Sequence, residues 1–261
     1  MIPETMKAVV LTGPVRGDEV SLTEYPVPKG RPGWVLVKVK AFGMNHSEQI
    51  LRQGEIRADY IQKPLIPGIE CVGEIADPSD SSFKKGQKVA ALMGGMGRSF
   101  NGSYGEYALL PVHHVFSVVS SLSWIELAAV PETYFTARGS LFEGLDLKPS
   151  DTLLIRGATC ALGYAAIQIG KALGCKVIAT THREKKLPLL KEADQAVLDP
   201  GELAGRLPGV TKALELVGPK TLGDTLNCME KGGIVCNTGI LGGIYGIRYF
   251  DPIKFIPNGV Y

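Results

Sequence analysis

The spacing of apolar residues changes character near the middle of the chain. Up to about residue 122, short runs of β-branched or alternating apolar residues are separated by turns rich in Gly and Pro. Such runs predict strands, which we place at 7–11, 34–41, 71–76, 87–92 and 104–110. Because these strands follow one another without long helices between them, the pattern favours a barrel-like antiparallel domain over residues 1–122.

Beyond residue 122, apolar strands alternate with helical patterns. The expected strands are 152–155, 176–180, 196–198, 213–217 and 234–238, and the expected helices are 125–130, 134–143, 165–173, 185–192 and 220–228. Alternation of this kind predicts a parallel, doubly wound sheet. We therefore expect residues 123–261 to form a second domain and the whole chain to be an α/β protein.

The segment 151–181 reads as strand, small-residue turn, helix and strand, which is the size of one βαβ unit. A tight turn lets a pyrophosphate approach the backbone, and the helix N-terminus behind it offers free N–H groups. Against the G-x-G-x-x-G pattern the turn reads Ala158, Cys160 and Gly163, so only the last glycine is present. The alternative is an ordinary βα turn. The candidate cofactor contacts are Gly157, Ala158, Thr159, Cys160, Ala161, Leu162 and Gly163.

Ligands of doubly wound sheets bind at the carboxyl ends of the strands. The candidate contacts at those ends are Thr181, Val217, Gly218, Thr238 and Gly239. NAD sites carry a carboxylate after the second strand, whereas this chain has His182 and Arg183 there, with Lys186 close behind. Cationic groups suit a 2′-phosphate, so we expect NADPH, with Arg183 as the main discriminator. The alternative is a basic first turn of a solvated helix, with Glu184 adding opposite charge.

Composition excludes several classes of protein. The 261 residues are 45% hydrophobic and 21% charged with a net charge of +2, so no strong field points to nucleic acid or an anionic membrane. No apolar run reaches the ~18 residues of a membrane helix, and the N-terminus does not read as a signal peptide, so we expect a cytoplasmic protein. The five cysteines form no C-x-x-C pair, which argues against structural zinc or a disulfide framework. Cys160 stands apart, because a helix N-terminus can lower the pKa of a thiol.

Six segments resemble the medium-chain dehydrogenase/reductase superfamily, in the order and spacing of that family. They are 37–48, 66–75, 83–92, 103–108, 131–137 and 232–239. The chain is most similar to the quinone oxidoreductase branch. The resemblance implies a GroES-like, β-rich catalytic domain followed by a Rossmann nucleotide-binding domain. Relatives run on past Tyr261 with a segment that returns to the catalytic domain, so we expect that return segment to be absent here.

The resemblance also bears on zinc. Zinc-dependent members place their three catalytic ligands where this chain has Asn45, Ile69 and Glu132. An isoleucine cannot ligate a metal, and an amide oxygen is a poor zinc ligand. We therefore expect no metal; the alternative is a metal held by His46 and Glu70.

Without a Lewis acid, a site suits hydride addition to an already polarised acceptor, such as a quinone or an α,β-unsaturated carbonyl. The resemblance places Asn45 in the active-site cleft, where its amide could donate to a carbonyl oxygen that gains charge. Alternatively, Asn45 is a turn-former before a short helix at 47–52. The resemblance matches Thr136 to a family threonine that contacts the nicotinamide end of the cofactor. Alternatively, the Thr136 hydroxyl bonds back to the preceding turn of its own helix.

No proton donor emerges from the sequence. Tyrosines that this branch often carries after the Asn are replaced by Ile50 and Ile56, and Tyr60 is the nearest phenol. The neighbours His113 and His114 are expected at a strand end, facing opposite ways as surface histidines.

These features predict a zinc-independent, NADPH-dependent oxidoreductase that transfers hydride to a quinone or an α,β-unsaturated carbonyl beside Asn45. Two alternatives remain open. One is an enoyl-thioester reductase of the same fold, and the other is an NADPH-binding sensor or structural protein without turnover. The expected partners are a small carbonyl or quinone substrate and, since relatives are commonly dimers, a second copy of the chain.

Overall fold

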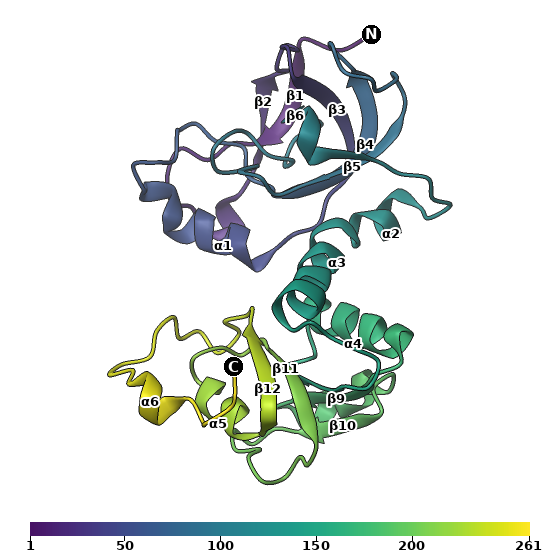
Figure 1. The fold of residues 1–261 in the computed structure, drawn as a ribbon. Helices are drawn as coiled ribbons and strands as arrows, with labels where there is room; N and C mark the ends of the chain where they lie inside the picture. The colour runs from purple at the N-terminus through teal and green to yellow at the C-terminus, as the bar shows by residue number, and fades with distance from the viewer. The chain divides into compact units, whose positions relative to one another are not determined.

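The computed structural model describes all 261 residues, which divide into two compact units. Unit 1 comprises Met1–Glu132 and unit 2 comprises Thr133–Tyr261 (Figure 1). The sequence pattern predicts the change of architecture after Leu122, ahead of the helices α2 (Trp124–Ala128) and α3 (Pro131–Arg138). Each unit has hydrophobic clusters of its own and is described separately.

Unit 1 is built from antiparallel strands, as the sequence predicts. A two-stranded sheet pairs β1 (Thr5–Val9) with β2 (Leu22–Pro26). A curled five-stranded sheet has the order β6-β3-β4-β5-β7, with strands β3 (Trp34–Ala41), β4 (Glu70–Asp77), β5 (Lys88–Leu92), β6 (Tyr107–Pro111) and β7 (Val115–Ser117).

The strand β3 shows how this fold is specified. Val35 and Val37 point into one hydrophobic cluster, while Leu36 points to the other side and packs with Met6 and neighbours of β1. Successive residues of a strand face opposite ways, so three consecutive buried apolar residues join two cores. Further along, Lys38 and Lys40 are exposed, and that side of the strand faces solvent.

Short helices connect the strands of unit 1. They are α1 (His46–Gln53) and three 3₁₀ helices, Gly17–Glu19, Glu55–Arg57 and Val112–His114. The last of these corrects an expectation, because His113 and His114 do not face opposite ways on a strand. Their rings meet edge to face, with centroids 4.1 Å apart. Partial burial, with a smaller effect of His113, lowers the pKa of His114.

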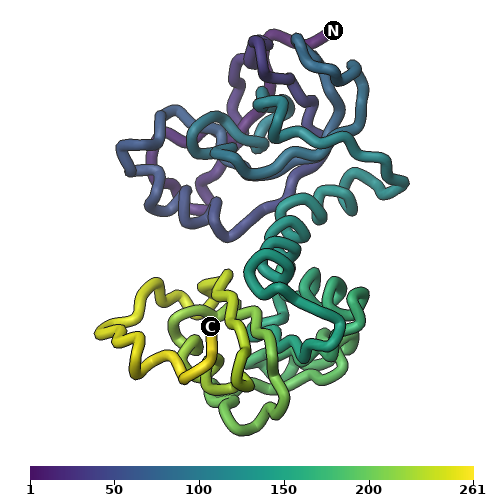
Figure 2. Tube along the Cα trace, viewed as in Figure 1, coloured from purple at the N-terminus to yellow at the C-terminus, as the bar shows by residue number.

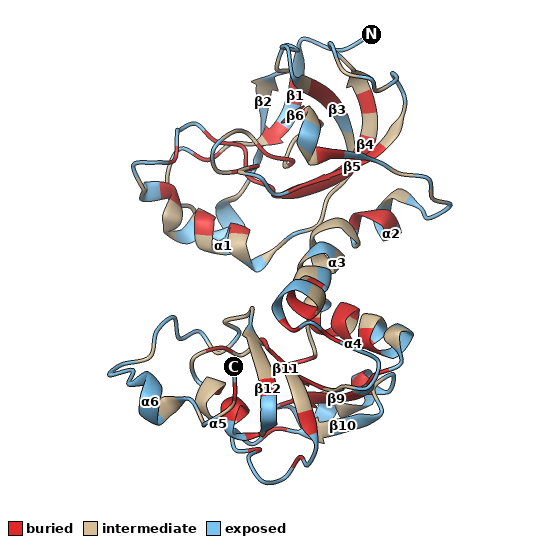
Figure 3. Cartoon of the chain, viewed as in Figure 1, coloured by how far each residue is buried: buried red, intermediate tan, exposed pale blue.

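Unit 2 holds a five-stranded parallel sheet of order β10-β9-β8-β11-β12. Its strands are β8 (Thr152–Arg156), β9 (Lys176–Thr181), β10 (Gln195–Leu198), β11 (Val210–Glu215) and β12 (Met229–Asn237). The central strands are largely buried, as the red segments of Figure 3 show. The chain moves outward from β8 to β10 and then returns to the other side of β8. This reversal puts a topological switch point between β8 and β11, where ligands of such sheets bind.

The helices of unit 2 mostly match the sequence pattern. They are the remainder of α3, the π-helical turn Gly139–Gly144, α4 (Ala161–Leu173), α5 (Leu222–Asn227) and α6 (Pro252–Phe255). The expected helix at 185–192 is instead a 3₁₀ helix, Glu184–Leu190. Pro188 lies inside it, and a proline has no N–H for the α-helical hydrogen bond. The chain end runs back beside β12 (Figure 2). There Tyr261 donates its N–H to the carbonyl of Gly233.

Candidate functional site

The turn after β8 begins the candidate cofactor site. Gly157 has a φ of +80°, a left-handed conformation that favours glycine. Cys160 caps the N-terminus of α4, and its Sγ accepts a hydrogen bond from the N–H of Gly163 at 3.4 Å. A Cβ added to Gly163 would lie 2.2 Å from the carbonyl oxygen of Ala158. Glycine at this position therefore lets the helix start directly against the turn.

A cavity of about 480 Å³ opens at the carboxyl ends of the parallel strands of unit 2. We call it the cofactor pocket. Seven of the expected contacts line it, namely Gly157, Thr159, Cys160, Thr181, Arg183, Lys186 and Val217. Residues from the ends of β8, β9 and β11 are thus brought together, as the switch-point rule predicts.

The other expected contacts lie outside the lining of this pocket. Ala158 is fully buried, and Gly163 packs on its carbonyl oxygen. Thr238 turns its hydroxyl to that of Ser140, 2.8 Å away, and Thr136 lies on α3. The remaining members of this group are Ala161, Leu162, Gly218 and Gly239. Their roles as cofactor contacts stay predictions.

Part of the lining was not predicted from the sequence. The additional residues are Thr180, His182, Asp199, Pro200, Gly201, Lys220, Thr221, Leu241 and Gly242. A signal for some of them was present, because Asp199, Pro200 and Gly201 directly follow β10. The rule that ligands bind at strand ends applies to that strand as well as to its neighbours.

A buried arginine joins the loops around the cofactor pocket. Arg156, the last residue of β8, is fully buried. Its guanidinium donates to both carboxylate oxygens of Asp199 at 2.8 and 3.0 Å and to Asp224 at 2.6 Å. It also donates to the hydroxyl of Thr225, which in turn donates to Glu215. Burial acts to lower the pKa of Arg156, but the hydrogen bonds and charges of Asp199 and Asp224 outweigh it and raise that pKa.

The same network fixes backbone groups that border the pocket. Glu215 accepts hydrogen bonds from the N–H groups of Val217 and Gly218 at 2.7 and 3.0 Å. Asp199 accepts one from the N–H of Gly201 at 2.8 Å. The loops after β8, β10 and β11 are therefore held by one connected set of charged hydrogen bonds, which are stronger than neutral ones.

The thiol of Cys160 behaves differently from what a helix N-terminus alone suggests. Burial raises its pKa and exceeds the opposing effects of the N–H groups of Gly163 and Leu162 and the charge of Lys186. The lowering considered from the sequence is therefore wrong. Cys160 instead caps α4 through its Sγ.

A second polar site lies in unit 1, around the start of α1. Asn45 precedes the helix, and its Nδ2 donates to Oε1 of Glu70 at 2.9 Å. The other oxygen of Glu70 accepts from the N–H of Glu132 at 2.8 Å. Glu48 accepts from the N–H groups of Asn45 and Ile69 at 2.7 and 2.9 Å. Two buried carboxyl groups thus connect Asn45, Ile69 and Glu132, the three positions singled out by the resemblance.

The electrostatics of this site are unusual because Glu70 has no ion pair. Burial raises the pKa of Glu70, and the hydrogen bonds from Asn45 and Glu132 only partly oppose this. Tyr104 donates its hydroxyl proton to Glu48 at 2.6 Å. Burial, and then that hydrogen bond, raise the pKa of Tyr104.

A cavity of about 530 Å³ opens beside this site, and we call it the α1 pocket. Its polar lining includes Asn45 and Tyr104. Tyr60 is not part of the lining; its hydroxyl donates to Glu55 instead. Ile56, at one of the positions where the resemblance implies a tyrosine, is fully buried in a hydrophobic cluster. Tyr104 is therefore the phenol of this site. From the sequence it stands out only as part of segment 103–108, which resembles the family.

Comparison with known proteins identifies the family. Residues 31–120 match the family described as alcohol dehydrogenase GroES-like domain, and residues 161–255 match the one described as zinc-binding dehydrogenase. Quinone oxidoreductase of Homo sapiens is 31% identical over 233 residues, which are 84% of this chain and 68% of that protein. The chain belongs to the medium-chain dehydrogenase/reductase superfamily, in its quinone oxidoreductase-like branch.

Other members of this superfamily support the assignment. Quinone oxidoreductase of Rattus norvegicus is 31% identical over 236 residues, covering 85% of this chain and 69% of that protein. Among solved structures, AibC has a TM-score of 0.87 at 28% identity, covering 95% of this chain and 78% of that one. The quinone oxidoreductase of Coxiella burnetii has a TM-score of 0.78 at 25% identity, covering 88% and 74%. The expected combination of a GroES-like and a Rossmann-like fold is confirmed.

As a member of this superfamily, the chain is an oxidoreductase. The family uses a nicotinamide cofactor, and its members act on small molecules. No helix has the length and apolar character needed to cross a membrane.

Proposed function

We propose that the chain is a zinc-independent, NADPH-dependent reductase that transfers hydride to a quinone or an α,β-unsaturated carbonyl. The observation that carries the proposal is the charge of the cofactor pocket. Arg183, Lys186 and Lys220 line it, and none of them forms an ion pair with a carboxylate. The one carboxylate in the lining, Asp199, is bound on both oxygens by Arg156.

The residues of the cofactor pocket fit a dinucleotide phosphate. The turn at Gly157 and the start of α4 present backbone to a pyrophosphate, which a helix N-terminus attracts. Arg183 and Lys186 would hold the 2′-phosphate, since a guanidinium makes two charge-assisted hydrogen bonds to such a group. Bound NADPH supplies the hydride.

The donor set of unit 1 does not fit a catalytic zinc. Of the three positions, Ile69 offers an alkyl side chain that is 5% exposed. Asn45 offers an amide oxygen, with its Nδ2 turned to Glu70. Zinc sites in proteins use thiolate, imidazole or carboxylate ligands, so we derive no step through a metal here.

Asn45 is the residue we assign to the substrate carbonyl. The hydrogen bond to Glu70 occupies one of the two N–H groups of its amide and fixes which side of the amide carries them. The second N–H remains to donate to a carbonyl oxygen in the α1 pocket, where Asn45 is part of the lining. A donor aimed at an oxygen that gains negative charge stabilises the transition state more than the ground state.

The test is a fluorescence titration of the purified protein with NADPH and with NADH. We expect much tighter binding of NADPH, and a loss of about 10- to 100-fold in NADPH affinity for Arg183→Ala, because bonds to charged groups contribute most. The matched control is Arg138→Ala, which removes an exposed arginine of unit 2 that is paired with Glu143. Equal affinity for the two cofactors would refute the assignment of Arg183.

Turnover is the second part of the test. Oxidation of NADPH is followed with a panel of quinones and α,β-unsaturated ketones, for the wild type and Asn45→Ala. The proposal requires turnover that falls in the variant while NADPH affinity is kept. Tight NADPH binding without any turnover would instead favour a sensor or structural protein.

A further inference from the structure

The α1 pocket is lined by an arginine, Arg52, that forms no ion pair. Asn45, which precedes α1, lines it together with Glu48 and Arg52 of that helix, the three being three or four positions apart. The apolar part of the lining consists of Val9, Leu11, Val20, Met44 and Pro67. A guanidinium in such surroundings is available to a ligand if its own contacts leave donors free.

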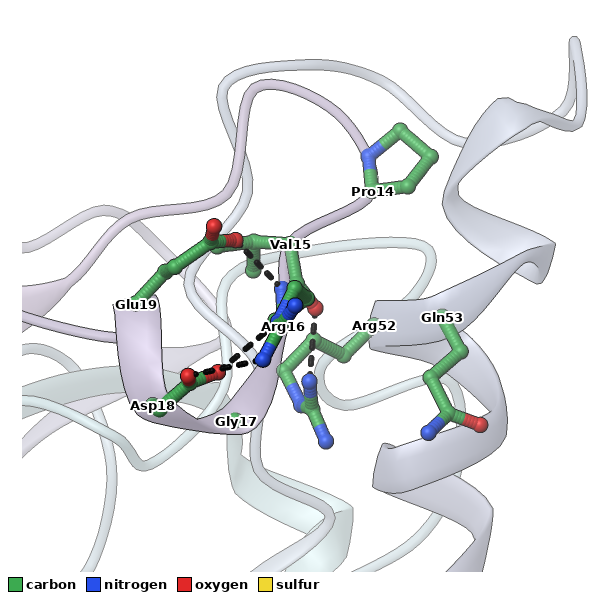
Figure 4. Close-up of a pocket in the computed structure, with 8 residues that line it drawn as sticks. All are labelled: Pro14, Val15, Arg16, Gly17, Asp18, Glu19, Arg52 and Gln53. Carbon is green, nitrogen blue, oxygen red and sulfur yellow. Dashed lines mark hydrogen bonds and ion pairs between the residues drawn. The ribbon is translucent and has the colours of Figure 1, made fainter.

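The contacts of Arg52 leave most of its donors free. Nη1 donates to the carbonyl oxygen of Val15 at 2.6 Å, as Figure 4 shows. A guanidinium has five N–H donors, and this is the one hydrogen bond that the Arg52 side chain makes. No ion pair forms between Arg52 and any carboxylate.

The nearby carboxylates are occupied elsewhere. Asp18 is bound by both Nε and Nη2 of Arg16, at 3.1 and 3.0 Å, and Glu19 accepts the N–H of Arg16 at 3.0 Å (Figure 4). On α1 itself, Glu48 is buried and accepts three hydrogen bonds, the last from Tyr104. None of these carboxylates accepts a hydrogen bond from Arg52, so the remaining N–H donors of its guanidinium are left for a ligand.

The surroundings of Arg52 also leave space for a ligand. A second cavity, of about 400 Å³, shares Arg52 and Gly17 with the α1 pocket. A Cβ added at Gly17 would lie 3.4 Å from Nη2 of Arg52. The absence of a side chain at Gly17 keeps this edge of the guanidinium uncovered.

We propose that Arg52 binds a carboxylate of the substrate, so that the preferred acceptor is an α,β-unsaturated ketone that carries a carboxylate group. This inference rests on the proposed reductase function. The ketone oxygen would lie at Asn45 and the carboxylate at the end of the long Arg52 side chain, both in the lining of the α1 pocket. The flat fork of a guanidinium matches a carboxylate in shape and in charge. The carboxylates Glu48, Asp18 and Glu19 near this single guanidinium disfavour a doubly charged phosphate more than a singly charged carboxylate.

The test compares an acid with its neutral amide. The two acceptors are 4-oxo-4-phenylbut-2-enoate and the corresponding primary amide, assayed with NADPH. For the wild type we expect kcat/KM to be about tenfold or more higher for the acid, and this preference to vanish in Arg52→Met, since charge-assisted bonds contribute most to such discrimination. Arg52→Lys should keep part of the preference, because it keeps the charge but not the fork.

The preference ratio separates recognition from folding. Loss of the hydrogen bond to Val15 would lower both rates in Arg52→Met, whereas loss of carboxylate recognition lowers the acid alone. The matched control is Arg57→Met, because Arg57 is an exposed arginine of unit 1 outside both cavities. An acid-to-amide ratio near one in the wild type, with both compounds reduced, would overturn the inference and leave the reductase function intact.

A binding measurement covers the case in which neither compound is reduced. Calorimetric titration uses the saturated acid 4-oxo-4-phenylbutanoate and its amide, which need no turnover. Binding of the acid that is lost in Arg52→Met supports the inference even if the proposed reaction fails. Equal binding of acid and amide, or binding unchanged in Arg52→Met, refutes it.

Discussion

Glu70 is a carboxyl group buried without a cation. Only 2% of it is exposed, and both oxygens accept hydrogen bonds, from Asn45 and from the backbone of Glu132. An ionised carboxylate in such a place costs free energy that these bonds only partly offset. The raised pKa of Glu70 expresses that balance, and it leads to a prediction on stability.

We expect the Glu70 carboxyl to make the wild type lose stability as pH rises. Its pKa is raised above the ordinary 4.5. Between the two values the folded protein keeps a proton that the unfolded chain has released, so the free energy of unfolding falls as pH increases. Glu70→Gln lacks this titration. The variant should be less stable than the wild type below pH 4.5, and the difference should shrink as pH rises through the raised pKa of Glu70.

Urea unfolding across that pH range measures the effect. Glu126→Gln is the matched control with the opposite sign, because hydrogen bonds from Ser123 lower the pKa of the exposed Glu126 carboxyl. Its stabilising contribution is lost as pH falls. A stability difference between wild type and Glu70→Gln that does not vary with pH would contradict the role given to burial.

Gly163 supports a second prediction at this scale. A methyl group there would meet backbone atoms of Ala158, the nearest at 2.2 Å, and backbone cannot swing aside as a side chain can. Gly163→Ala should cost about 1–3 kcal/mol of stability and weaken NADPH binding, since the start of α4 is pushed from the turn. In Gly139→Ala the methyl group meets no atom within 4 Å, so thermal unfolding should be unchanged or slightly raised. Equal destabilisation in both variants would exclude steric conflict as the cause.

At the scale of elements, Arg156 connects the strand ends that border the cofactor pocket. Its partner Asp199 directly follows β10, and its partner Asp224 lies on α5. One side chain therefore connects β8, the loop after β10 and a helix. Removing one member of a buried ion pair leaves uncompensated charge, which costs more than the pair itself contributes.

Arg156→Met should therefore destabilise unit 2 by about 3–5 kcal/mol. The comparison variant is Arg138→Met, whose ion pair with Glu143 is 65% and 74% exposed, and there the loss should be about 0–1 kcal/mol. Unfolding is measured in urea, because guanidinium chloride is a salt and would screen the ion pairs under test. Similar losses in the two variants would show that the Arg156 cluster is no stronger than a surface pair.

At the scale of the whole molecule, local patterns account for the order of the elements. Period-two alternation and Gly or Pro boundaries locate β3 and β5 within a residue, and Gly174, in a left-handed conformation at φ +93°, ends α4 as expected. The pattern fails where a local rule competes with it. Apolar spacing at 185–192 indicates an α-helix, but Pro188 prevents the regular hydrogen bonds.

The sites were predictable only in part, for a different reason. Strand ends converge in a parallel sheet, so Gly157, Thr181 and Val217 could be grouped from sequence order alone. The polar networks could not, because their members are far apart along the chain. Arg156 finds Asp199 and Asp224 only after folding, 43 and 68 residues away. No spacing rule indicates such pairs.

The cofactor pocket and Asn45 belong to different units, and this separation gives the last prediction. Every residue that lines the cofactor pocket belongs to unit 2, while Asn45 belongs to unit 1. A ligand that binds only the folded state stabilises it by about 2.7 kcal/mol at a concentration of 100 times its Kd. NADPH should therefore raise the unfolding temperature of Asn45→Ala as much as that of the wild type, and the rise should be much smaller for Arg183→Ala. Differential scanning calorimetry with and without NADPH makes the comparison. A rise that disappears in Asn45→Ala but persists in Arg183→Ala would reverse the proposed roles, making Asn45 a cofactor ligand and Arg183 a solvated surface residue.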